Sequence, residues 1–170
     1  MINRMLRIIC MGMFAALFML SGQAADMPRE IHGSADAFAA PGMALAWGVL
    51  RGATDDATLV VIRIVTDSAV FTDVAVAGID PFTGRQQSLL SFTPSTSGVV
   101  ELRTPRSHFA DYPRTELRFF GPAVPQTPRA ASLLVFYLGV PDTTPEFTDE
   151  ARLNAYLRER IAQVKAGKRP

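Results

Sequence analysis

The residues best suited to chemistry lie in one polar stretch in the second half of the chain. His108 and Asp111 are three residues apart, and Arg106 and Arg114 lie on either side of them. An imidazole with guanidinium groups nearby can bind an anionic ligand, so these four are the candidate ligand-binding residues. The formal charge over residues 101–118 is only +1, however. A solvated loop with local ion pairs is therefore favoured over an anion pocket.

Two reactive sites, a hydrolase triad and a copper site, are less consistent with the sequence. A hydrolase triad would combine Asp111 and His108 with a serine such as Ser34 or Ser107, but nothing in the sequence places that serine. A copper site would use imidazole and thioether ligands, which suit that metal but show no ligand spacing here. Its four candidate ligands are His32, His108, Met27 and Met43. Neither a catalytic site nor a metal site is expected.

Other catalytic and cofactor motifs are missing from the sequence. It has no G-x-S-x-G elbow, no H-E-x-x-H pair and no glycine-rich loop that leads into a helix. The only cysteine, Cys10, lies in an N-terminal apolar run. A formal net charge of +1 lacks the excess of positive charge that is typical of nucleic-acid-binding proteins. We expect a protein that is not an enzyme, needs no cofactor and binds no nucleic acid.

The N-terminus has the pattern of a secretory signal peptide. Arg4 and Arg7 precede the apolar run 8–20, and small residues follow it. Gly22 and Ala24 fit the two positions that signal peptidase reads, so cleavage after Ala24 is expected, with Ala25 and an uncleaved anchor as alternatives. The apolar run is shorter than the roughly 20 residues that span a membrane. Residues 1–24 are thus predicted to direct export to the periplasm or the medium, with no membrane span left after processing.

The region 43–140 alternates short apolar runs with turn signals, and 25–42 is expected to be a leader loop before it. The connections are too short for crossover helices, so antiparallel pairing is predicted. An immunoglobulin- or fibronectin-like β-sandwich of about seven strands fits this pattern best. The expected strands are 43–50, 59–66, 71–79, 88–92, 99–103, 117–120 and 132–140.

The segment 141–170 is expected to contain an amphipathic helix, over about 146–166. Apolar residues recur there at helical spacing; they are Leu153, Tyr156, Leu157, Ile161 and Val164. Strand 59–66 is apolar on both faces, as is typical of strands covered on both sides. We therefore expect the helix to pack on the sandwich, and a helix docked on a partner is the alternative.

A partner protein is the expected ligand, since sheet edges can accept an added strand. The best interaction candidates are Phe119 and Phe120, followed by Pro122 and Pro125 in an extended proline-rich stretch. Adjacent strand residues point to opposite faces, so one of the two phenylalanines is expected to be exposed. The sequence predicts an exported accessory or structural protein that works by protein–protein interaction. A periplasmic protein that binds a small ligand or a metal is the alternative.

Overall fold

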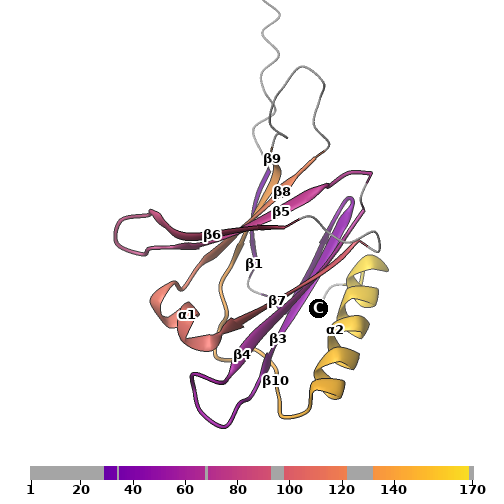
Figure 1. Ribbon diagram of the computed structural model, residues 1–170. Helices are drawn as coiled ribbons and strands as arrows, with labels where there is room; N and C mark the ends of the chain where they lie inside the picture. Colours follow the sequence, from indigo (N-terminus) through magenta and orange to yellow (C-terminus); the bar gives the residue numbers. More distant parts are fainter. Residues whose placement is uncertain (1–28, 34, 68, 93–97, 122–131, 169–170) are drawn as a thin grey trace, which may run out of the picture.

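A computed structural model describes residues 29–33, 35–67, 69–92, 98–121 and 132–168 (Figure 1). The expected signal peptide, Pro122 and Pro125 lie outside the described residues. The elements, in chain order, are β1 (Arg29–Gly33), β2 (Ala37–Ala40), β3 (Met43–Leu50), β4 (Leu59–Thr66), β5 (Asp73–Ile79), β6 (Gln86–Phe92), β7 (Val99–Pro105), α1 (Arg106–Asp111), β8 (Thr115–Phe120), β9 (Ser132–Leu138), β10 (Glu146–Phe147) and α2 (Glu150–Lys165).

The described strands form two sheets. The first sheet has the order β1-β9-β8-β5-β6, and the second has the order β10-β3-β4-β7 with β2 also paired to β3. The expectation of a mainly β protein with a C-terminal helix is confirmed, and each of the seven expected strands is present as one of β3–β9. Antiparallel pairing holds for β3–β4, β5–β6 and β8–β9, but the pairs β1–β9 and β10–β3 are parallel. Parallel neighbours need long connections, and about a hundred residues separate β1 from β9.

The expected leader loop over 25–42 is wrong for two of its segments, which form β1 and β2. Ile31 of β1 packs against the core between the sheets. β2 pairs antiparallel with β3 through a tight turn in which Gly42 has φ of +82°. The dipeptide Pro41-Gly42 therefore makes a hairpin where the sequence suggested a loop. Short, small-residue strands such as β2 carry a weak alternation signal, which explains the error.

The main core lies between the two sheets. Its largest fully buried side chains are Trp47 from the second sheet and Phe119 and Phe136 from the first. Trp47 and Phe136 meet edge to face, with ring centroids 6.1 Å apart. The inward-facing side chains alternate along β4 and β9, as strands with one face on a core require. This core holds the two sheets face to face.

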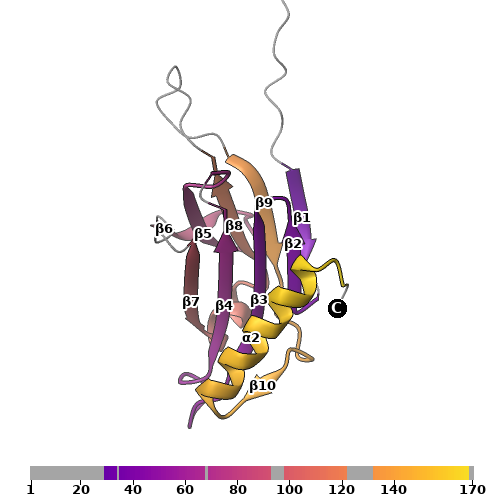
Figure 2. The same cartoon turned by 90° about the vertical axis from the view of Figure 1, so that its right-hand side faces the viewer.

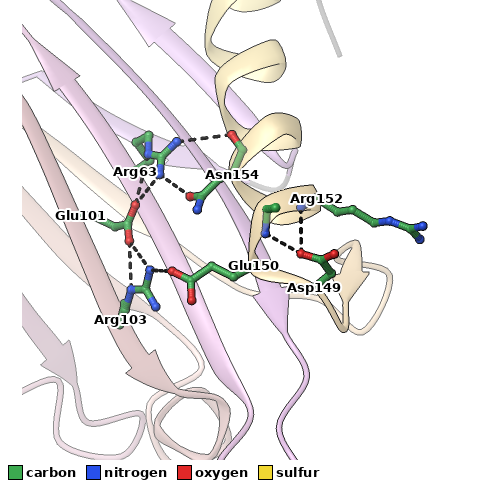
Figure 3. Close-up of polar contacts among 8 residues, drawn as sticks. Arg63, Glu101, Arg103, Asp149, Glu150, Arg152 and Asn154 are labelled. Atoms are coloured by element: carbon green, nitrogen blue, oxygen red, sulfur yellow. Dashed lines mark hydrogen bonds and ion pairs between the residues drawn. The ribbon is translucent and has the colours of Figure 1, made fainter.

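Helix α2 forms a third layer on the outer face of the second sheet (Figure 2). Its buried side chains are Leu153, Leu157, Ile161 and Val164. The helix begins later than the sequence suggested because Glu146 and Phe147 pair with β3 as β10. Asp149 is the N-cap, and its carboxylate accepts hydrogen bonds from the backbone N–H groups of Ala151 and Arg152 (Figure 3).

Small residues on β3 allow the helix to come close to the sheet. Ala44 and Ala46 are fully buried on this face, and a Cβ added at Gly48 would lie 2.8 Å from Cδ1 of Leu153. On β4, Val61 meets the helix while Ile62 faces the opposite core. The strand that the sequence showed to be apolar on both faces is thus covered on both faces.

A polar network fastens one side of α2 to β4 and β7 (Figure 3). Arg63 donates to Glu101 over 2.6 Å and to the side-chain oxygen of Asn154 over 2.5 Å. Arg103 bridges Glu101 and Glu150. Burial opposes ionisation of Glu101, but hydrogen bonds from Arg63 and Arg103 outweigh it and hold the pKa of this carboxyl below its usual value.

The other side of α2 is fastened to the segment between β1 and β2. Arg160 binds the Asp36 carboxylate through two of its nitrogens, and the Tyr156 hydroxyl donates to the same carboxylate. Bidentate pairs of this kind fix orientation as well as distance. Helix α2 is therefore an integral layer of the fold.

Replacing a leucine under this helix should destabilise the whole protein. Leu157 is fully buried, so Leu157→Ala leaves a cavity and should lower the free energy of unfolding by about 2–5 kcal/mol in chemical denaturation. Leu133→Ala is the matched control: its side chain is 46% exposed, and the change should cost less than about 1 kcal/mol. Equal losses for the two variants would contradict the third-layer role of α2.

Candidate functional site

The polar stretch around His108 contains a short helix, α1, where the sequence suggested a loop. Phe109 on this helix is buried and joins the core between the sheets. His108, next to it, is half-buried and packs against Phe109 and Tyr112. One apolar anchor in a polar segment gives too little periodicity to predict a helix of six residues.

The four candidate ligand-binding residues do not converge. Arg106 forms ion pairs with Glu146 at 2.5 Å and Asp142 at 3.2 Å. The guanidinium carbon of Arg114 lies 4.7 Å from the ring centroid of Tyr137, on the outer face of the first sheet. Asp111 is exposed and acts on His108 only through its charge. The alternative of an anion pocket formed by these four residues finds no support, because both arginines are engaged elsewhere. Of the four, His108 lines a cavity.

That cavity lies between the two sheets near edge strand β7 and has a volume of about 230 Å³. We call it the inter-sheet cavity. Side chains from both sheets and from α1 line it, and most of them are apolar. Its lining residues are Ile62, Val76, Gly78, Leu102, Arg103, Thr104, Pro105, His108, Phe109 and Thr115. Such concave, mostly apolar sites with a few polar groups are typical of small-molecule binding.

Gly78 brings the two inner polar groups of the cavity together. It is the cross-strand partner of Thr115, and a Cβ added to it would lie 3.2 Å from Nε2 of His108. Thr115 is only 2% exposed, and its hydroxyl has no hydrogen-bond partner among the described residues. A buried hydroxyl without a partner is costly, because it has lost water without replacing that hydrogen bond.

Burial also sets the state of the imidazole. It lowers the pKa of His108, and the negative charge of Asp111 opposes this only in part. His108 is therefore neutral at neutral pH, with one ring nitrogen able to accept a hydrogen bond. The sequence could not give this geometry, since residues 78, 108 and 115 come from three separate elements.

A second polar group crosses the outer face of the first sheet. His32 stacks on Tyr137, with centroids 5.0 Å apart, and Tyr137 is the cross-strand neighbour of the buried carboxylate Glu116. Arg118 and Gln86 donate to that carboxylate. Burial, followed by the charges of Glu116 and Glu30, raises the pKa of the Tyr137 hydroxyl. Each polar group in this row has a partner, so the row supports the sheet.

The interaction candidates Phe119 and Phe120 differ in burial. Phe119 is fully buried between the sheets and packs on Phe71 at 5.5 Å, so its side chain faces no partner. Phe120 points to the outer face and is half-buried. Pro122 and Pro125 lie outside the described residues. Neither phenylalanine is exposed, so the expectation of one exposed phenylalanine is wrong, and the sequence could not assign which of the two meets the core.

Sequence reasoning missed the large apolar side chain that is most exposed among the described residues. Phe82 is 96% exposed at the turn between β5 and β6, which was identified only as a turn. The available signal was a large apolar residue at the centre of a turn sequence, where polar residues are usual.

Within the described ranges, no three side chains of His, Cys, Asp or Glu gather closely enough to hold a metal ion. No helix in the described part of the chain is long and apolar enough to cross a membrane. No protein-family model, curated protein or solved structure matches the chain.

The His108 imidazole should titrate below its ordinary pKa of 6.5 in an NMR pH titration. A His108→Gln variant assigns the signal by removing it. Asp111→Asn should lower the midpoint further, because Asp111 favours the charged form. The unfolded chain binds this proton more readily, so wild-type stability should fall relative to His108→Gln as the pH drops below 6.5. A midpoint at or above 6.5 would contradict the burial described here.

Proposed function

We propose that this chain is an exported accessory or structural protein that binds a partner protein through the tip of the β5–β6 hairpin. The observation that carries the proposal is the 96% exposure of Phe82. Figure 1 shows the hairpin projecting away from α2 and the second sheet. Solvent-exposed aromatic residues of this kind are favoured anchors in protein interfaces.

Hydrogen bonds hold the tip in one conformation. Asp80 Oδ1 accepts from the backbone N–H groups of Phe82 and Thr83, both over 2.8 Å. The backbone of Asp80 also bonds to Gly84 and Arg85, and Gly84 adopts a φ of +67° that favours glycine. An anchor that is already ordered loses less conformational entropy on binding. Arg85 beside it supplies a second residue type that is common at binding hot spots.

Export is supported by the N-terminal sequence. Arg4 and Arg7, the apolar run 8–20 and the small residues before Ala25 together have the order of a signal peptide. Cleavage after Ala24 would remove Cys10 and both arginines, so the formal charge would change from +1 to −1. We propose a periplasmic or secreted location on this basis.

We also propose that the two sheets form an immunoglobulin- or fibronectin-like sandwich. The links β4–β5, β6–β7 and β7–β8 each pass from one sheet to the other, while β5–β6 and β8–β9 are hairpins within the first sheet. These Greek-key crossings are typical of that architecture. The pairing of the antiparallel neighbours β4–β7 and β5–β8 agrees with it. Sequence and topology thus favour the same fold.

The mature chain should begin at Ala25. Mass spectrometry of the protein recovered from the extracytoplasmic fraction should show the loss of residues 1–24. Arg4 and Arg7 both replaced by glutamate should leave the full-length chain in the cytoplasm, because the positive region directs insertion. Recovery of the uncleaved chain in the extracytoplasmic fraction would contradict the cleavage site, and wild-type protein confined to the cytoplasm would contradict export.

Phe82 should be the contact point with the partner. A photoreactive phenylalanine analogue at position 82 should form one specific adduct in the cells that make the protein. The protein that cross-links to position 82 should bind the Phe82→Ala variant with a dissociation constant roughly 30-fold higher than for the wild type. This is the effect of losing a binding hot spot of about 2 kcal/mol. Thermal stability should be unchanged, since the side chain contacts solvent.

The matched control places the same analogue at Ala162, which is exposed on α2. This position should give no adduct of the same mass. Equal labelling from both positions, or none from position 82, would contradict partner binding by the hairpin tip.

A further inference from the structure

The inter-sheet cavity holds one polar group that the fold leaves unused. Thr115 is inward-facing on β8, like the core residues Leu117 and Phe119 that follow it at alternate positions. Thr115 lines the cavity, and its buried hydroxyl has no hydrogen-bond partner within the described chain. A ligand that supplies this bond would recover the hydrogen bond that folding removed from Thr115.

The second polar group is positioned at the same place. The His108 imidazole lies against Gly78, whose missing side chain makes room for it, and Gly78 is directly opposite Thr115 in the sheet. An imidazole and a threonine thus both neighbour one glycine, the imidazole packed against it and the threonine opposite it on the next strand. A hydroxyl group is both donor and acceptor, so a single ligand hydroxyl can satisfy both groups.

The charge of the cavity restricts the ligand further. Arg103 is among the lining residues, but Glu101 and Glu150 engage its guanidinium on the outer side of β7. No unpaired charge among the described residues is therefore available inside to balance a charged ligand. Burying an unbalanced charge is far more costly than burying a hydroxyl.

Apart from Thr104, the remaining side chains of the walls are apolar and define the size. Ile62, Val76, Leu102 and Phe109 surround a volume of about 230 Å³. An apolar protein cavity of roughly 150 Å³ is enough to hold benzene. We propose that the inter-sheet cavity binds a small, uncharged, largely apolar molecule that carries one hydroxyl group, held between Thr115 and His108. This proposal is independent of partner binding by Phe82.

Phenol is the probe for this site, with toluene as the equivalent ring that lacks the hydroxyl and benzoate as a charged analogue. In NMR titrations of the full mature protein, phenol should shift the signals of Thr115, His108 and Gly78. Toluene should bind about tenfold more weakly, the value of one hydrogen bond. Benzoate should not bind. Saturable shifts confined to the outer surface would overturn the site.

Thr115→Val removes the hydroxyl and keeps the shape, so phenol should lose one of its two hydrogen bonds and keep the one to His108. Its preference over toluene should therefore fall severalfold. Thr144→Val is the matched control, because Thr144 is also buried with an unpartnered hydroxyl in the described chain but does not line this cavity. It should leave the tenfold preference intact. Leu102→Phe fills the cavity and should abolish binding of both rings.

Two results would overturn the proposal. One is a phenol preference that is undiminished in a folded Thr115→Val variant. The other is the absence of phenol binding to the wild type at millimolar concentration, together with a higher melting temperature for Thr115→Val. That combination would mean that the cavity serves no ligand and that the hydroxyl is only a structural cost.

Discussion

The fold depends on the burial of both faces of β3 and β4. Their inner side chains, including Trp47 and Ile62, build the core against the first sheet, and their outer side chains meet α2. A sheet that is apolar on both faces cannot leave either in water, because exposed apolar area costs about 25 cal/mol per Å². The helix is therefore required, and its salt bridges fix its orientation on a surface that hydrophobic contact already selects.

This constraint also explains which parts of the fold could be predicted. The run Leu59–Thr66 shows its two apolar faces directly in the sequence, and the helical spacing from Leu153 to Val164 supplies the matching cover. Long, strongly patterned segments carry enough signal to be assigned from sequence alone. By contrast, β2 and α1 are short, and each depends on a tertiary contact for its stability. Local pattern could not give either of them.

The candidate site was harder to predict for a related reason. Sequence proximity grouped His108 with Arg106 and Arg114, yet β-structure sends neighbouring residues to opposite faces and separate layers. The polar residue that shares a cavity with His108 is Thr115, the cross-strand partner of the Gly78 against which the imidazole lies. A threonine in a strand and a glycine beside it carry no distinctive signal. Only the register between strands shows that they meet an imidazole.

The parallel pairing of β1 with β9 has a consequence for how the protein is made. Arg29–Gly33 and Leu134–Leu138 form one ladder, so nearly the whole chain must be available before the first sheet can close. Contacts this distant in sequence slow folding, because a large loop must be ordered before they form. On the ribosome, the first sheet would thus stay incomplete until β9 emerges, and the same pairing would then join two segments about a hundred residues apart.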